Sequence, residues 1–247
     1  ITLVAAQIIN HIAKFRWMYN DQVHLPLTIR TPMGGRRGYG PTHSQTLEKI
    51  FLGIPGLRIL APSTLQQVDP HEDSLFPYGG AADLLYRQVL QGEEPALFIE
   101  NKLLYLLRTQ DTASLPDFLL ETYPEPSHTG SNQPHCPTFA LSIQGAPPAT
   151  LTLAAYGYMA ELARQAALRL AYENEIFVEL VVPTQLAPFE LDPVLESVRR
   201  TGHLLTIEEG TQTLGWGTEI IAQTAEALGP KLKMARRLAA QPHPIPA

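Results

Sequence analysis

Hydrophobic residues recur along the chain with two alternating spacings, which predict helices and strands in turn. Val4, Ile8, Ile9, Ile12 and Phe15 recur at helical spacing, so we expect an amphipathic helix over residues 3–18. Apolar residues then alternate with polar or small ones over residues 23–29, which is the spacing of a strand. Strands that alternate with helices in this way predict an α/β fold with parallel sheets covered on both faces.

The same series continues, with one interruption. The first half contains segments typical of a helix at 43–52, a strand at 57–61, a helix at 81–90 and a strand at 96–99. From 107 to 150 the pattern is lost among proline, serine and threonine, which predicts a linker and a domain boundary. We therefore expect two α/β domains, residues 1–135 and 136–247.

The second half repeats the alternation. A helix is expected to begin with Asp192 as its cap and Pro193 at its first position. The other expected elements are strands at 151–155, 176–182, 203–208 and 231–237, and helices at 159–172 and 218–228.

Composition narrows the class of protein. The chain has 247 residues, of which 45% are hydrophobic, enough to build a substantial core. Its net charge of -6 argues against nucleic acid as a main partner. A single cysteine, Cys136, excludes an internal disulfide and fits a reducing compartment. No apolar run reaches membrane-spanning length, so we expect a cytoplasmic protein that does not enter a membrane.

The most informative stretch is the glycine-rich segment from Arg30 to Gln45, which carries four glycines and ends close after His43. A strand that opens into such a loop is a favoured ligand-binding place in open α/β sheets. A histidine there can titrate near neutral pH and act as acid, base or donor to developing charge. The alternative is a structural turn in which His43 only caps the next helix. The segment is not a phosphate-binding P-loop, because it lacks the Gly-Lys-Ser/Thr ending, and its glycine spacing does not match a dinucleotide fingerprint.

Several motifs in order carry a resemblance to a known family. They are Gly-Tyr-Gly-Pro-Thr-His-Ser-Gln at 38–45, Phe-Leu-Gly-Ile-Pro-Gly-Leu at 51–57, Pro-Ala-Leu-Phe-Ile-Glu-Asn at 95–101, His-Leu-Leu-Thr-Ile-Glu-Glu-Gly at 203–210 and Gly-Trp-Gly-Thr-Glu at 215–219. In these motifs, which span nearly the whole chain, the sequence resembles the β subunits of pyruvate and branched-chain 2-oxo acid dehydrogenases.

The resemblance implies a fold and a function. Residues up to about 135 would form the pyrimidine-binding domain of the thiamine diphosphate fold, and the rest a transketolase C-terminal-like domain. The reaction would be oxidative decarboxylation of a 2-oxo acid with acyl transfer to lipoyl-lysine. In this family the β subunit works with an α subunit, which holds the diphosphate and its Mg²⁺, in an α2β2 assembly that serves a lipoyl-bearing acyltransferase core.

The resemblance also suggests individual site residues. His43 matches the active-site histidine of the family, and Arg36, Arg37 and Tyr39 lie on the loop that would meet the substrate or the lipoyl arm. Arg36 and Arg37 are equally well explained as solvated loop residues. A potassium site of the family, built from backbone carbonyls, would fall on Val89, Leu90, Gly92 and Glu94, although Gly92 departs from the common aspartate.

Other family residues have no counterpart. The glutamate that activates the cofactor and the aromatic residue that stacks on its ring would lie upstream of Ile1, so we expect activity to require residues before Ile1 as well as the α subunit. The alternatives are a single-chain relative such as a transketolase, or a non-catalytic pseudo-subunit with an assembly role. The substrate remains open among pyruvate, branched-chain and other 2-oxo acids.

Three further groups carry weaker functional interpretations. His128, His135 and Cys136 contain metal-ligand types, but their setting favours loop residues over a metal site. Glu208 and Glu209 form a possible acid/base pair, for which an interface or turn role is the stronger interpretation. Trp216, between two glycines, is interpreted as a packed aromatic and not as a substrate platform.

Overall fold

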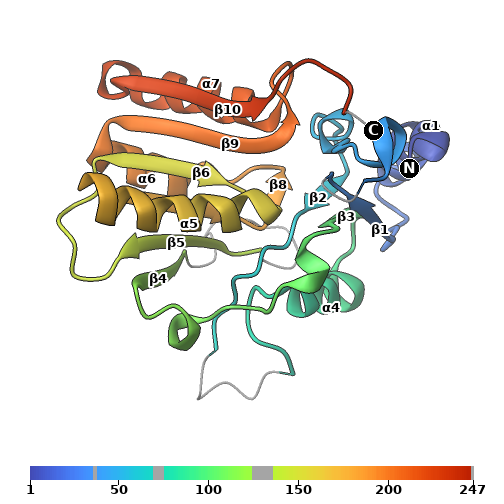
Figure 1. Ribbon diagram of the computed structural model, residues 1–247. Coiled ribbons are helices and arrows are strands. Elements are labelled where there is room, and N and C mark those ends of the chain that lie inside the picture. Colours follow the sequence, from blue (N-terminus) through green and yellow to red (C-terminus); the bar gives the residue numbers. More distant parts are fainter. Residues whose placement is uncertain (36–37, 69–74, 124–135, 246–247) are drawn as a thin grey trace.

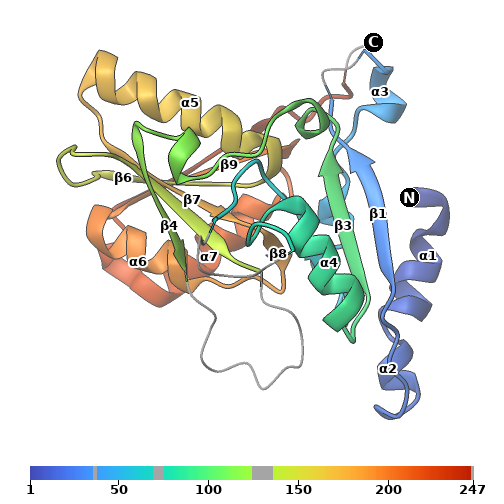
Figure 2. The same cartoon turned by 90° about the horizontal axis from the view of Figure 1, so that it is seen from below.

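The computed structural model describes residues 1–35, 38–68, 75–123 and 136–245. The first sheet has four strands in the order β1-β3-β2-β8, and three of them come from the first half of the chain. Strands β1 (Thr28–Met33), β3 (Ala96–Asn101) and β2 (Arg58–Leu60) are parallel. The fourth strand, β8 (Gln185–Ala187), comes from the second half of the chain and runs antiparallel to β2. Helix α4 (Ala81–Gln91) connects β2 to β3 and lies beside them (Figure 2).

The second half builds a six-stranded mixed sheet. Four neighbouring strands of this sheet, β10, β9, β6 and β7, are parallel to one another, as the alternation of strands and helices predicts. Two antiparallel strands extend it beyond β7. In spatial order the strands are β10 (Met234–Ala240), β9 (His203–Thr211), β6 (Leu151–Ala155), β7 (Val178–Pro183), β5 (Thr138–Ile143) and β4 (Phe118–Tyr123).

Helices cover both faces of this larger sheet (Figures 1 and 2). Helix α5 (Gly157–Asn174) lies on one face, where its alanines pack on the strands. Helices α6 (Asp192–Thr201) and α7 (Trp216–Leu228) lie on the other. This layering confirms the doubly covered α/β architecture.

One hydrophobic core joins the two sheets. Ile59 and Leu97 of the first sheet belong to the same buried cluster as Val181 of the second sheet and Trp216 of helix α7. Because apolar burial is the main favourable term in folding, this shared core fixes the position of one sheet against the other. Any site where the two sheets meet is therefore held on both sides by packed side chains.

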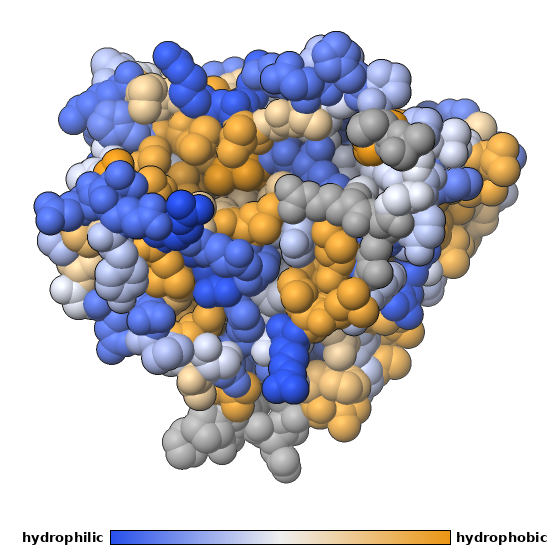
Figure 3. Space-filling view, in the orientation of Figure 1, coloured by the Kyte–Doolittle hydropathy of each residue, from blue (hydrophilic) through white to orange (hydrophobic). Residues whose placement is uncertain are grey.

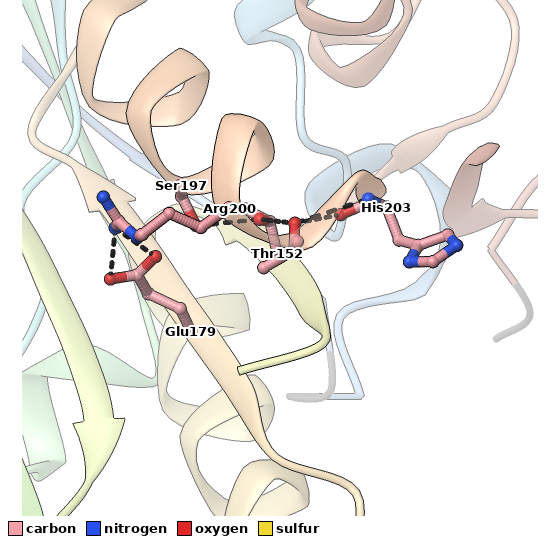
Figure 4. A network of polar contacts seen from close by, with 6 residues as sticks. Thr152, Glu179, Ser197, Arg200 and His203 are labelled. Atoms are coloured by element: carbon pink, nitrogen blue, oxygen red, sulfur yellow. Dashed lines mark hydrogen bonds and ion pairs between the residues drawn. The ribbon is translucent and has the colours of Figure 1, made fainter. Parts of the chain in front are cut away.

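A polar network stabilises the larger sheet at the amino ends of its parallel strands (Figure 4). The hydroxyl of Thr152 lies 2.8 Å from the hydroxyls of both Ser197 and Thr201, which ties α6 to β6. Arg200 on the same helix forms an ion pair with Glu179 at 2.7 Å. These contacts lie at the end of the sheet opposite the glycine-rich loop, so we assign them a structural role.

The amino-terminal segment is helical, as expected, but not one regular helix. It consists of short turns at Thr2–Val4, Ala5–Gln7 and Phe15–Met18, with a π-helix at Ile8–Ile12 between them. Ile8 is buried, whereas Val4, in the 3-10 turn before it, is 47% exposed. The following strand, β1, begins at Thr28 and not at residue 23, after Pro26, which has no N–H for a sheet.

Two further expectations are wrong. Residues 43–52 do not form a helix: a four-residue helix α3 ends at His43, and one 3-10 turn covers Glu48–Ile50. The intervening chain bonds back to the end of β1 instead, through Gly34 N–H to the Gln45 carbonyl and Leu47 N–H to the Met33 sulfur. Such tertiary hydrogen bonds compete with helical ones.

The expected linker over 107–150 is also wrong for much of its length, because it contains β4 and β5, paired with each other along six residues. Strand β4 precedes residue 135 in the chain but belongs to the second sheet. The division of the chain between residues 135 and 136 therefore stays a prediction. At α6, Asp192 is the first helical residue and Leu191 the cap, so the expected cap lies one position away.

Exposed hydrophobic residues lie at several places on this face of the molecule, among them the side of the amino-terminal segment and α4 (Figure 3). They include Leu3, Trp17, Met18, Val89, Leu90 and Leu106. Within the described residues, no helix combines the length and the apolar character needed to cross a membrane.

Candidate functional site

The glycine-rich loop begins where β1 ends and lies at the carboxyl ends of the parallel strands. Gly34 has a φ of +100°, and a Cβ added there would lie 2.6 Å from Nδ2 of Asn101, the last residue of β3. Both the backbone angle and this close approach require glycine. The carboxyl ends of parallel strands are the usual ligand-binding edge of such sheets, and the loop occupies that edge.

His43 stands at the exposed end of this loop. Its side chain faces solvent, and no ring hydrogen bond to another described residue is present. The backbone is fixed, because Nζ of Lys102 donates a hydrogen bond to the His43 carbonyl. The same ammonium group lies 5.3 Å from the ring centre of Tyr39. The structure thus brings His43 and Tyr39 together around Lys102, while Arg36 and Arg37 lie outside the described residues.

The second half of the chain supplies a carboxylate to the base of the loop. Oε1 of Glu209 accepts a hydrogen bond of 2.6 Å from the backbone N–H of Gly35, and Oε2 accepts one of 2.6 Å from Nδ2 of Asn101. Glu209 therefore joins β9 to the carboxyl ends of β1 and β3. Its neighbour Glu208 points elsewhere and accepts hydrogen bonds from the backbone N–H groups of Trp216 and Gly217, at the start of α7.

A buried acidic pair lies next to this contact. The hydroxyl of Tyr156 donates a 2.6 Å hydrogen bond to Oε1 of Glu48, and both residues are buried. Burial raises the pKa of Glu48 and, against the opposing hydrogen bond from Tyr156, favours its neutral form. Burial also raises the pKa of Tyr156 well above its usual value, and the carboxyl of Glu48 adds to that shift.

Burial likewise raises the pKa of Glu208 to about 7, although the two N–H donors of α7 oppose the shift. Glycines make room for this carboxyl: a Cβ at Gly215 would lie 2.4 Å from Glu208 Oε1. Glu208 therefore acts as the cap of α7, in agreement with a turn role and without contact to an open cleft.

A small cavity lies between the two halves beside Glu209. It has a volume of about 20 Å³ and is lined by residues that include Met33, Glu48, Asn101, Tyr156 and Glu209. That volume holds about one water molecule, so a cofactor cannot enter it.

A larger pocket of about 580 Å³ lies against the start of α7 and is lined by residues that include Leu52, Phe189, Leu214 and Trp216. Trp216 itself is 2% exposed and packs edge-on against Tyr156 and Phe189, with ring centres 5.1 and 5.6 Å away. This geometry agrees with a packed aromatic.

The candidate potassium residues lie at the end of α4 and in the turn that follows it. Val89 and Leu90 are exposed on the last helical turn, and Gly92 caps the helix. The carbonyl of Glu94 already accepts a hydrogen bond of 3.0 Å from Nε2 of Gln88. A potassium ion would have to share the Glu94 carbonyl with the Gln88 amide or displace that amide. The site stays a prediction.

Cys136 does not form a metal site in the described part of the chain, where no cluster of three or more histidine, cysteine or carboxylate residues is suited to a metal. Its thiol is buried and accepts a hydrogen bond of 3.1 Å from Nη2 of Arg58. Burial raises the pKa of Cys136 to about 11. His128 and His135 lie outside the described residues.

A comparison with known protein families finds a match in the second half of the chain. A model of the family "Transketolase, C-terminal domain" matches residues 146–247. The match covers β6, α5 and every later element of the six-stranded sheet, and it bears out the fold expected for this part of the chain.

The chain as a whole is similar to the β subunits of known enzymes. It is 31% identical to the acetoin:2,6-dichlorophenolindophenol oxidoreductase subunit beta of Cupriavidus necator, over 97% of this chain and 61% of that protein. It is 30% identical to the pyruvate dehydrogenase E1 component subunit beta of Porphyra purpurea, over 100% of this chain and 64% of that protein. The expected resemblance is confirmed, and the chain spans less than two thirds of the length of these relatives.

A solved structure shows the same fold. The chain superposes on a split gene transketolase, described as an inactive beta4 tetramer, with a TM-score of 0.56, 17% identity and coverage of 96% of this chain and 64% of that one. This likeness extends across both sheets, so the first sheet also has the transketolase architecture.

Sequence reasoning missed the residues that hold the loop. Asn101 ends a buried strand and Lys102 follows it. That position was a usable signal, because polar side chains at the carboxyl ends of parallel strands face the ligand edge. The pairing of Glu48 with Tyr156 had no such signal, because the two residues are 108 positions apart in the sequence.

Proposed function

We propose that this chain belongs to the β subunit of a 2-oxo acid dehydrogenase that completes a thiamine diphosphate site together with an α subunit. The reaction is oxidative decarboxylation of a 2-oxo acid with transfer of the acyl group to lipoyl-lysine. The observation that carries the proposal is the exposed imidazole of His43, held by a fixed backbone at the carboxyl ends of β1 and β3. The similarity to β subunits along nearly the whole chain supports it.

The residues present fit one wall of a cofactor site. Gly38 and Gly40 both have open space where a Cβ would stand, which leaves room at the loop surface for a ligand or a second polypeptide. In this proposal the diphosphate and its Mg²⁺ are held by the α subunit. A potassium ion near Gly92 and an α2β2 assembly on a lipoyl-bearing acyltransferase core remain parts of the proposal.

His43 would act through its proton. Thiamine diphosphate supplies the electron sink for decarboxylation when it is bound. The imidazole, placed at the edge of the site, donates a hydrogen bond or a proton to negative charge that develops on the substrate, and it takes the proton back afterwards. Tyr39 and Lys102 hold the neighbouring loop surface, and closure by the α subunit would exclude water and strengthen the interaction.

The test uses the full-length β protein that contains this chain, co-purified with its α subunit. We expect CO₂ release from pyruvate or a branched-chain 2-oxo acid, and acylation of a lipoyl domain, both dependent on added thiamine diphosphate. His43→Ala should lower the acylation rate about 100-fold or more, the range of general acid–base catalysis.

His203→Ala is the matched control, because His203 bonds the Thr150 carbonyl at the opposite end of the sheet. Its rate should stay near that of the unmodified protein. An assembly that neither binds thiamine diphosphate nor releases CO₂ from any 2-oxo acid would contradict the proposed function.

A further inference from the structure

The carboxylate of Glu209 is held between two donors that come from distant parts of the chain. Oε1 lies 2.6 Å from the backbone nitrogen of Gly35, and Oε2 lies 2.6 Å from Nδ2 of Asn101. Each oxygen serves one donor, and hydrogen bonds to an ionised carboxylate are the stronger kind. The contact is therefore a bidentate bridge from the second sheet to the first.

The amide of Asn101 is oriented for this bridge. Its Oδ1 accepts a hydrogen bond of 2.9 Å from the backbone N–H of Leu103, which turns Nδ2 toward Glu209. Gly34 packs directly on the same amide, at a distance that leaves no room for a Cβ. The first two residues of the glycine-rich loop thus rest on Asn101 and Glu209.

The far end of the loop is tied to the same place. The N–H of Gly34 donates to the Gln45 carbonyl at 3.1 Å, and Lys102, next to Asn101, donates to the His43 carbonyl. A shift of Gly34 and Gly35 would therefore move the segment that carries His43. The small cavity lined by Asn101 and Glu209 leaves little space to absorb such a shift.

We propose that Glu209 is a positioning residue, contributed by the transketolase C-terminal domain, that sets where the loop presents His43. It acts through Gly35 and Asn101 and touches neither substrate nor cofactor. Both of its oxygens already accept hydrogen bonds, so it is not a free acid or base. The catalytic consequence rests on the proposed function, whereas the effect on loop position does not.

An exchange of the hydrogen-bond donor and acceptor between positions 101 and 209 tests the bridge. In Glu209→Gln, the side-chain oxygen can still serve Gly35, but its NH₂ group then faces the NH₂ group of Asn101. In Glu209→Gln with Asn101→Asp, the new carboxylate at position 101 accepts from that NH₂ group and can still accept from Leu103. The double variant keeps both hydrogen bonds and the net charge of the pair, so it should restore what the single variant loses.

The first measurement is hydrogen exchange at the Gly35 amide in the full-length β protein with its α subunit. We expect Glu209→Gln to raise the exchange rate about tenfold or more, and the double variant to return it to within about threefold of the unmodified protein. Exchange that is unchanged by Glu209→Gln, or not restored in the double variant, would overturn the proposal whether or not the assembly is active.

The second measurement is lipoyl acylation by the same assemblies. Glu209→Gln should lower kcat about tenfold or more, leave KM for the 2-oxo acid within about twofold, and be rescued by the double variant. An equal fall in both variants would also overturn the positioning role. If the unmodified assembly lacks activity, the proposed function fails, and the exchange data alone decide the role of Glu209.

Glu208→Gln is the matched control, because Glu208 neighbours Glu209 but caps α7 and makes no contact with the loop. We expect it to lower the melting temperature and to leave Gly35 exchange and kcat unchanged. A change of Gly35 exchange in this control equal to that in Glu209→Gln would mean that general loosening of the fold, and not the bridge, controls the loop.

Discussion

The hydroxyl of Tyr156 donates a 2.6 Å hydrogen bond to Glu48, and the two residues come from the two different halves of the chain. Tyr156 directly follows β6 in the second sheet, whereas Glu48 lies in the 3-10 turn after the glycine-rich loop. The second oxygen of Glu48 is buried without a partner among the described residues. The interface between the halves thus depends on a few buried polar contacts as well as on the shared apolar core.

Removal of that hydroxyl should destabilise the fold. Tyr156→Phe leaves the buried carboxyl of Glu48 without its side-chain partner, and an unsatisfied buried polar group costs about 1–3 kcal/mol. The free energy of unfolding from urea titration measures the effect. Tyr172→Phe makes the same chemical change at a side chain that is 73% exposed and should alter stability by less than about 0.5 kcal/mol. Equal effects of the two variants would contradict the role assigned to Tyr156.

The raised pKa of Glu208, about 7, makes stability depend on pH. An unfolded glutamate has a pKa near 4.3, so between that value and about 7 the folded state binds more protons at this residue. Its contribution is fully present below about pH 4 and is lost as the pH rises through about 7.

The variant Glu208→Gln does not titrate at this position, so its unfolding free energy provides the reference. We expect the unfolding free energy of the unmodified protein to fall relative to that of this variant as pH rises from about 5 to 8. Glu226→Gln, on the exposed face of α7, should give a difference that does not vary with pH. A difference for Glu208→Gln that grows in favour of the unmodified protein over this range would mean that its folded pKa is not raised.

Gly34→Ala should destabilise the fold in two ways, through the positive φ and through the contact with Asn101. Gly145→Ala tests the first of these alone. Gly145 has a φ of +72° with open space at the Cβ position, whereas Gly34 has both a positive φ and a close contact with Asn101. Gly145→Ala should lower the free energy of unfolding only through its backbone angle, by about 1–2 kcal/mol. Gly34→Ala should cost clearly more in urea unfolding and should also impair lipoyl acylation. Equal costs at the two positions would show that the contact with Asn101 is not tight in solution.

Cys136 should be unreactive in the folded protein. The thiolate is the reactive species, and burial together with a pKa of about 11 leaves almost none of it at neutral pH. Because Cys136 is the single cysteine of the chain, modification by a disulfide reagent reports on it alone. We expect modification to follow the rate of unfolding in urea. Complete modification within seconds under native conditions would contradict the buried position.

The sequence predicted the elements whose burial is regular. Helix α4, strand β3 and the alternation from β6 to β10, apart from the short strand β8, were expected within a few residues, because each has an apolar face of a clear period. The predictions failed where tertiary hydrogen bonds override local pattern. Residues 44–47 bond to the end of β1, and the proline-rich stretch before β6 pairs as β4 and β5.

The site was predicted only in part for the same reason. Motif resemblance singled out His43 and the loop around it, and the position of that loop at the carboxyl ends of β1 and β3 follows from strand order. The contacts that hold the loop join residues up to 174 positions apart, as between Gly35 and Glu209. No local pattern encodes such a pairing, so Glu209 could only be weighed as one half of a Glu-Glu pair.

The most direct test of the central claim is the reactivity of His43 toward diethyl pyrocarbonate, followed residue by residue with mass spectrometry. The full-length β protein is labelled alone and in complex with its α subunit and thiamine diphosphate, with the partly exposed His24 as internal reference. If His43 forms one wall of a site that a second polypeptide closes, its modification rate should fall about tenfold or more in the complex while that of His24 stays constant. Equal labelling of His43 with and without the α subunit and cofactor would contradict the account.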